Sequence, residues 1–291
     1  MPKPTTDALE VPGATLHYET RGSGPVLLLI PGGAADAGLY EGMAPDLAAH
    51  YTVVSYDPRG LSRSPLDGPL TDQRVDVWSD DAHRLLELLS PHESAYVLGC
   101  SSGAVVALDL LARHPERLRR VVAHEPPLIE ALEDPAPHRR LFAEVRETFR
   151  RDGVGPAMAR FNEGLGGQPS DRPTELPPEI QEMAARMHAN LPVFLEHVLC
   201  PFTATVPDLA ALRPAADRLI LAAGRESREQ EPLYGPARRL AQLLGLGGEV
   251  VEFPGGHVGA TEHPKEFAKQ LLALLLGPAD VSLRPHSTEL R

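Results

Sequence analysis

The stretch Ala95-Tyr96-Val97-Leu98-Gly99-Cys100-Ser101-Ser102-Gly103 runs from an apolar strand pattern directly into a helical one. Ala95–Gly99 predicts a short buried strand, and Gly103–Arg113 predicts a helix that ends before Pro115. Between them lies the pattern G-x-S-x-G, which in this strand-turn-helix context is typical of a nucleophile elbow. A side chain at either glycine would collide with the neighbouring strand or helix. The turn is therefore expected to expose the Ser101 hydroxyl at a helix N-terminus, where backbone N–H groups favour a developing oxyanion.

Two neighbours of Ser101 also carry groups that are chemically able to attack, namely Cys100 and Ser102. Only the central position of the motif, two residues from each glycine, points out of the elbow. Ser101 is therefore predicted to be the nucleophile, and Cys100 is expected to be a small packed side chain.

Strand and helix patterns alternate on both sides of the elbow. The predicted strands are Ala14–Glu19, Val26–Ile30, Tyr51–Tyr56, Ala95–Gly99, Arg120–His124, Leu219–Ala223 and Glu249–Phe253. An amphipathic helix is predicted where apolar residues recur at helical spacing, at Val75, Trp78, Ala82, Leu85 and Leu89. Further helices are predicted over Gly103–Arg113, Tyr234–Leu244 and Pro264–Leu276. This alternation predicts an α/β fold, with a mainly parallel twisted sheet and helices on both faces.

The strand pattern is interrupted once, between Pro126 and about Pro214. This stretch has helical segments rich in Phe, Met and Leu, and it holds many of the chain's 30 prolines. Residues 128–214 are therefore predicted to form a helical cap, inserted into a core made of residues 1–127 and 215–277. Residues 278–291 lack periodicity and are expected to form a flexible C-terminal tail. A length of 291 residues suits one such core with a cap.

The composition restricts the partners of the chain. A formal net charge of −12, without a Lys/Arg run, argues against nucleic acid and anionic membranes as partners. The N-terminal residues lack an apolar signal segment, and the apolar runs are too short to span a bilayer, so a cytoplasmic location is expected. With only two cysteines and no metal or dinucleotide motif, neither a metal nor another cofactor is expected. The expected partner is a small-molecule substrate, and the oligomeric state is left open.

The segment Gly255-Gly256-His257-Val258-Gly259 follows the last predicted strand and precedes the last predicted helix. Its glycines allow the loop to bring the imidazole over the elbow, within hydrogen-bond reach of Ser101 Oγ. A histidine that follows the nucleophile in chain order is typical of hydrolases with such an elbow. His257 is therefore predicted to be the general base.

These motifs are similar to those of the α/β-hydrolase superfamily, which the chain resembles over about residues 8–276. The segment Pro31-Gly32-Gly33 resembles the family's His-Gly oxyanion loop, with Pro31 in place of the more usual histidine. The resemblance implies that the N–H groups of Gly33 and Ser102 form an oxyanion hole. Asp57–Ser64 resembles the segment D-x-R-G-x-G-x-S, with Ser62 where glycine is common, and it is expected to have a structural role.

The acid of the triad departs from the common pattern of the family. Related hydrolases usually carry Asp in the loop after the strand at Leu219–Ala223, but this chain has Ser227 at that place. Two glutamates can substitute: Glu226, one residue earlier, and Glu125, which ends the strand after the elbow helix. Glu125 is favoured because some members, including a subset of haloalkane dehalogenases, take their acid from that earlier strand end. Pro126 is also expected to keep Glu125 extended. Glu226 is the fallback, and Asp208 is a second one.

The predicted cap has more large apolar side chains than a lid over a polar substrate needs, so an apolar or mixed small molecule is expected. Met187 and Phe194, seven residues apart, are expected to share a helix face and are candidate substrate-binding residues. The sequence leaves open whether that face looks into the site.

Together these features predict a serine hydrolase that cleaves an ester, lactone or thioester bond of a small, partly apolar molecule through an acyl-enzyme. A cofactor-free perhydrolase and a C–C bond hydrolase are alternatives, since both occur on this fold with a serine nucleophile. A non-catalytic ligand-binding module on a hydrolase fold is an alternative of another class. A complete Ser-Glu-His set favours turnover.

Overall fold

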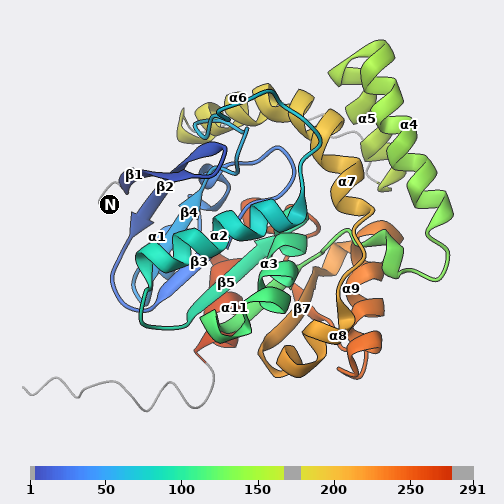
Figure 1. The fold of residues 1–291 in the computed structure, drawn as a ribbon. Coiled ribbons are helices and arrows are strands. Elements are labelled where there is room, and N and C mark those ends of the chain that lie inside the picture. The colour runs from blue at the N-terminus through green and yellow to red at the C-terminus, as the bar shows by residue number, and fades with distance from the viewer. Residues whose placement is uncertain (1–3, 167–177, 277–291) are drawn as a thin grey trace, which may run out of the picture.

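A twisted sheet of eight strands lies at the centre of the computed structural model, which describes residues 4–166 and 178–276 (Figure 1). Its strands are β1 (Thr5–Val11), β2 (Ala14–Arg21), β3 (Val26–Ile30), β4 (Thr52–Tyr56), β5 (Ala95–Cys100), β6 (Leu118–His124), β7 (Leu219–Gly224) and β8 (Val251–Phe253). The strand order is β1-β2-β4-β3-β5-β6-β7-β8. The pairs β1-β2 and β2-β4 are antiparallel, and every later pair is parallel. The predicted mainly parallel sheet is therefore confirmed.

The strand β1 is an addition to the predicted set. It pairs with β2 at the edge of the sheet, and most of its residues are exposed. An exposed edge strand needs no continuous apolar run, so it lacks the signal that identified the buried strands.

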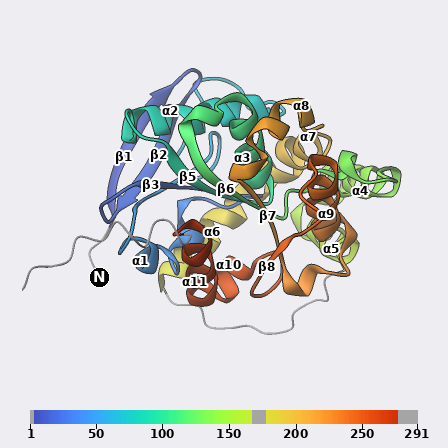
Figure 2. The same ribbon diagram turned by 90° about the horizontal axis from the view of Figure 1, so that it is seen from below.

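Helices cover both faces of the sheet, as predicted (Figure 2). One face carries α2 (Val75–Leu89) and α3 (Ser102–Arg113), and the other carries α1 (Ala44–Leu47) and α11 (Pro264–Leu275). Between α1 and β3 lies the short 3-10 helix η1 (Ala37–Tyr40). In the described part of the chain, no helix has both the length and the apolar character that a membrane crossing requires.

Between β6 and β7 the described residues form helices and no strand. These are η3 (Ile129–Ala131), α4 (Ala136–Asp152), α5 (Val154–Gly164), α6 (Pro178–Val193), the π-helical turn η4 (Phe194–Val198), α7 (Leu199–Thr203), α8 (Leu209–Leu212) and η5 (Arg213–Arg218). Figure 1 shows α4 to α7 gathered beyond one end of the sheet, so a helical cap is present. The limits 128 and 214 stay predictions, and the predicted tail 278–291 lies outside the described residues.

After the cap, β7 is followed by η6 (Arg225–Ser227) and α9 (Glu231–Leu244), and β8 is followed by α10 (Gly259–Glu262). The register of the central strands aligns their carboxyl ends. Cys100 of β5 is opposite His124 of β6, and His124 is opposite Ala222 of β7. The residues that follow these positions therefore leave the sheet side by side, where parallel strands form the usual crevice for a site.

Candidate active site

Ser101 lies at the tip of a sharp turn between β5 and α3. Its backbone has φ 55° and ψ −124°, a left-handed conformation that is costly for a residue with a side chain. A Cβ at Gly99 would lie 2.2 Å from the carbonyl oxygen of Gly103, and one at Gly103 would lie 2.2 Å from that of Ile30. Backbone atoms therefore approach both positions so closely that only glycine fits, as predicted.

The neighbouring thiol of Cys100 is buried in the core below the elbow. Burial, together with the charge of Glu125, raises the pKa of Cys100 to about 12, although a contact with Tyr40 opposes the shift. The thiolate form that would act as a nucleophile is therefore absent at neutral pH. This supports the choice of Ser101 over Cys100.

The loop between β8 and α10 brings His257 onto the elbow. Its Nε2 lies 3.1 Å from Ser101 Oγ, and its Nδ1 lies 2.6 Å from Glu125 Oε2. A carboxylate can only accept, so Nδ1 carries the proton and Nε2 is free to accept the proton of the Ser101 hydroxyl. Both distances lie within the hydrogen-bond range that is expected between a nucleophile, a base and the carboxylate that orients the base.

Glu125 is the carboxylate that reaches the base. It is fully buried, and its second oxygen, Oε1, accepts from the backbone N–H of Gly224 at 2.7 Å. The backbone of Glu125 has φ 49°, so the expectation that Pro126 keeps this residue extended is wrong. Proline disfavours the right-handed α region for the residue before it, and here the chain takes the left-handed region instead. This turn directs the side chain across the end of β7, toward His257.

Glu226, the fallback, takes no part in this arrangement. It lies in η6 after β7, and its side chain is exposed. Ser227, at the place where relatives commonly have Asp, is fully buried, and its Oγ has no hydrogen-bond partner among the described residues. The structure therefore places Glu125, and not Glu226, beside His257.

A buried histidine lies behind the acid. His124, the last residue of β6, packs edge-on against Phe253 and Phe267, with ring centroids 5.7 and 5.3 Å away. Burial, aided by the charge of His257, lowers the pKa of His124 to about 4 despite the opposing effect of Glu125, so this side chain is neutral at neutral pH. Nothing in the local sequence distinguishes His124 from a core residue of its strand, so its place beside Glu125 is visible only in the structure.

The pKa of Glu125 reflects its burial and three neighbouring groups. Burial alone would raise it, but the hydrogen bond and charge of His257, with smaller effects of His124 and the Gly224 N–H, lower it to about 2. Glu125 is therefore ionised at neutral pH, which is the state that can stabilise a protonated imidazole.

The residues expected to form the oxyanion hole are adjacent. The Gly33 N–H donates to Ser102 Oγ at 2.8 Å, and Gly33 has φ 62°, a conformation that glycine adopts without strain. A Cβ at Gly32 would lie 2.7 Å from the Cβ of Ser101, so the loop after β3 passes directly against the nucleophile. The Gly33 N–H therefore lies beside the elbow, where Ser102 Oγ accepts from it.

An apolar pocket opens beside Ser101 and His257. Its other lining residues are Ser102, Pro127, Phe142, Phe161, Leu165, Phe194, Val198, Leu199, Phe202, Thr203 and Leu233. None of these described residues is Asp, Glu, Lys or Arg. The hydroxyl of Thr203 donates to the carbonyl oxygen of Leu199 at 2.8 Å, so it is already engaged within the cap.

Only one of the two candidate substrate-binding residues lines this pocket. Phe194 does so, whereas Met187 is half-buried on α6 and is not among the lining residues. The expected shared helix face is interrupted because the α-helix ends at Val193 and a π-helical turn starts at Phe194. As for metals, the described residues contain no group of three or more His, Cys, Asp or Glu side chains that could hold an ion.

The comparisons with known proteins agree with this fold. A family model described as the alpha/beta hydrolase fold matches residues 25–162. The chain belongs to the α/β-hydrolase superfamily, since the hydrolase YraK of Bacillus subtilis (strain 168) is 38% identical over 272 residues, 92% of this chain and 94% of YraK. A zearalenone hydrolase of Bionectria ochroleuca is 27% identical over 269 residues, which cover 89% of this chain and 93% of that protein. The structure of a thermophilic esterase from Thermogutta terrifontis has a TM-score of 0.71 at 18% identity, covering 94% of this chain and 98% of the esterase.

Proposed function

We propose that this member of the α/β-hydrolase superfamily is a serine hydrolase that cleaves an ester or lactone bond through an acyl-enzyme. The observation that carries the proposal is the continuous relay from Ser101 Oγ to His257, 3.1 Å, and from His257 to Glu125, 2.6 Å. A nucleophile in hydrogen-bond contact with a base, itself oriented by a buried carboxylate, is the arrangement that activates a serine.

In the acylation step, Ser101 Oγ attacks the substrate carbonyl carbon while His257 Nε2 takes the hydroxyl proton. The carbonyl oxygen becomes an oxyanion, which accepts from the N–H groups of Gly33 and Ser102. The oxyanion replaces Ser102 Oγ as the partner of the Gly33 N–H. Glu125 stabilises the imidazolium through Nδ1–H. The imidazolium then gives its proton to the leaving alkoxide, and the bond between the carbonyl carbon and the alcohol oxygen breaks.

In the deacylation step, His257 takes a proton from water, and the resulting hydroxide attacks the acyl carbon of Ser101. The proton returns to Ser101 Oγ as the second tetrahedral intermediate collapses, and the carboxylic acid leaves. For a lactone, the alcohol and the acid are two ends of one product, so the same steps open a ring.

The pocket supports an apolar or mixed substrate. Its cap wall is formed by aromatic and aliphatic side chains, and the described lining residues include no Asp, Glu, Lys or Arg. A carboxylate or phosphate on the acyl part would lose its hydration there without gaining a cationic partner, which is costly. Neutral aromatic or aliphatic esters and lactones are therefore the substrates to test, with zearalenone among them because two relatives are named for it.

Labelling with a fluorophosphonate tests the proposal. The wild type should form one adduct, which peptide mass mapping places on Ser101. Ser101→Ala should form none, and it should lose p-nitrophenyl butyrate hydrolysis by a factor on the order of 10⁶ in kcat, as for removal of other triad nucleophiles. A stable adduct on another residue would overturn the assignment of the nucleophile. An unlabelled, inactive wild type would instead favour a ligand-binding module on the hydrolase fold.

A further inference from the structure

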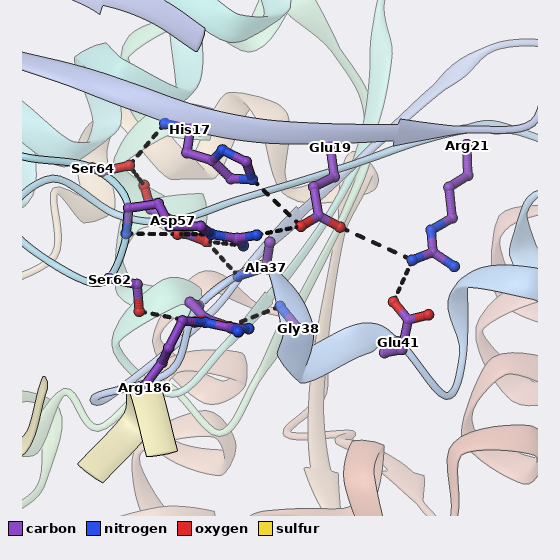
Figure 3. Close-up of polar contacts among 12 residues, drawn as sticks. His17, Glu19, Arg21, Ala37, Gly38, Glu41, Asp57, Ser62, Ser64 and Arg186 are labelled. Atoms are coloured by element: carbon purple, nitrogen blue, oxygen red, sulfur yellow. Dashed lines mark hydrogen bonds and ion pairs between the residues drawn. The ribbon is translucent and has the colours of Figure 1, made fainter. Parts of the chain in front are cut away.

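The cap helix α6 is joined to the core by an ion pair between the half-buried Arg186 and the buried Asp36. Asp36, which follows the loop after β3, is fully buried, and Arg186 of α6 donates to it through Nε, 2.5 Å, and Nη2, 3.3 Å. The same carboxylate accepts from Ser62 Oγ at 2.8 Å and from the N–H of Gly38 at 2.9 Å (Figure 3). Burial alone would raise the pKa of Asp36, but Arg186, Ser62 and the Gly38 N–H lower it, so Asp36 is ionised at neutral pH.

A second residue of α6, one helical turn later, reaches the same loop. Asn190 is buried, and its Nδ2 donates to the carbonyl oxygen of Ala34, 2.9 Å, and to Ser62 Oγ, 2.8 Å. Its Oδ1 accepts from the N–H of Ser62 at 2.9 Å. Ser62 has φ 47°, so Asn190 also holds a strained turn of the core in place. Arg186 and Asn190 therefore connect one face of α6 to two core loops.

A second buried carboxylate, that of Asp57, stabilises the core side of this junction. Asp57 accepts from the N–H of Ala37 at 3.0 Å and from Arg63 through Nε, 2.8 Å, and Nη2, 2.9 Å. Arg63 in turn donates to Glu19 of β2 at 2.9 Å. This gives Asp57–Ser64 the structural role expected from the sequence. The segment from Asp36 to Gly38 is thus held from the core side by Asp57, and from the cap side by α6.

The loop held in this way also carries Gly33, and the helix that holds it leads into the pocket. Gly33 precedes Ala34, to which Asn190 donates, and Phe194 follows Asn190 by one turn. A Cβ at Gly33 would lie 3.9 Å from Cε2 of Phe194, so the ring lies in contact distance over the oxyanion loop. The position of α6 therefore sets both the Gly33 N–H and the aromatic wall above it.

We propose that Arg186 and Asn190 are positioning residues for the reaction, which act through Asp36 and Ala34 to hold the oxyanion loop in its productive place under the cap. The inference rests on the proposed serine hydrolase function and extends it to residues outside the triad. The Gly33 N–H is used fully only when charge has developed on the substrate oxygen, so misplacement of its loop raises the energy of the transition state more than that of the bound substrate.

Three variants test the proposal on p-nitrophenyl acetate, whose small acyl group makes little use of the pocket. Arg186→Gln and Asn190→Ala should each lower kcat about tenfold, with KM changed by less than about threefold, because loss of one oxyanion donor outright costs 10²- to 10³-fold. Arg160→Gln is the matched control, since Arg160 has similar exposure but pairs with Glu144 inside the cap, at 2.8 Å. It should keep the kcat of the wild type.

A cycle of substitutions separates positioning from folding. If Arg186 acts through Asp36, the kcat of the double variant Asp36→Asn/Arg186→Gln should be no lower than that of the less active of the two single variants. Arg186→Lys, which keeps a positive charge beside the buried carboxylate but not the two-pronged contact, should retain the fold and recover part of the kcat. Melting temperatures of all variants are measured in parallel.

The outcomes are separable from those of the proposed function. The inference is overturned if folded Arg186→Gln and Asn190→Ala have the kcat of Arg160→Gln, or if they change only KM or only the melting temperature. Failure of the proposed function would appear earlier, as a wild type without fluorophosphonate labelling or ester turnover.

Discussion

The ends of β6 and β7 are neighbours in the sheet, yet they contribute in different ways to the base. After β6, Glu125 turns into a left-handed conformation and reaches His257 with one oxygen. After β7, Gly224 supplies an N–H to the other oxygen of Glu125, while Ser227 is buried and Glu226 is exposed. The β7 end, where relatives commonly carry the acid, here supports a carboxylate that comes from the end of β6.

In this molecule the carboxylate beside His257 comes from the end of β6 and not from the end of β7. Adjacent parallel strands end at one edge of the sheet, so either can deliver an acid to the same imidazole. A residue at the β6 end must cross the end of β7 to do so, and the Gly224 N–H stabilises its carboxylate along this path.

The largest effect is expected from Glu125→Gln. The amide can donate to His257 and stabilise the wrong tautomer, so kcat should fall by about 10⁴-fold, the size of the effect of the corresponding change in a serine protease. Steady-state kinetics with p-nitrophenyl butyrate measure this, and circular dichroism verifies the fold. A loss of less than about tenfold in a folded variant would remove Glu125 from the triad.

A second experiment moves the acid to the other strand end. Ser227 lies close to the loop of His257, since a Cβ at Gly256 would be 3.4 Å from Ser227 Oγ. Adding Ser227→Asp to Glu125→Gln should therefore recover at least about tenfold of the lost kcat, because a carboxylate again meets the imidazole. Ser227→Asn in the same background is the control and should recover nothing. Equal rates for the two double variants would show that the β7 end cannot hold an acid.

The buried carboxylate at the β6 end should also be visible in the pH dependence of stability. The pKa of Glu125 is lowered from 4.5 to about 2, so its contribution is fully present above about pH 4.5 and is lost as the pH falls toward 2. From pH 6 to pH 3, the wild type should lose about 2 kcal/mol more free energy of unfolding than Glu125→Gln does. Urea titrations at several pH values measure this difference. Identical pH slopes for the two proteins would contradict the lowered pKa.

The smallest effect is expected at the exposed position of the β7 end. Glu226→Gln removes a charge from a side chain in η6 that does not reach His257. Its kcat and KM should stay within about twofold of the wild type, and its stability should change little, as for most surface substitutions. A loss comparable to that of Glu125→Gln would reverse the assignment of the acid.

Local patterns in the sequence determined much of this protein. The elbow at Ser101, the glycine-flanked loop of His257 and the alternation of strands and helices are each encoded within a few residues, because each depends on backbone geometry or on periodic burial. The insertion of a helical cap follows from the one long gap in the strand pattern. These features need no knowledge of which distant segments meet.

The tertiary structure decided what depends on distant segments. The family resemblance favoured Glu125 over Glu226, but the expectation of an extended backbone at Glu125 was wrong. Its left-handed turn is stabilised by contacts with β7 and His257. The pairing of Asp36 with Arg186, 150 residues apart, has no local signal at all. Such contacts arise only when the cap folds onto the core, because burial then makes a partner necessary for each charge, and no periodic pattern records which partner it will be.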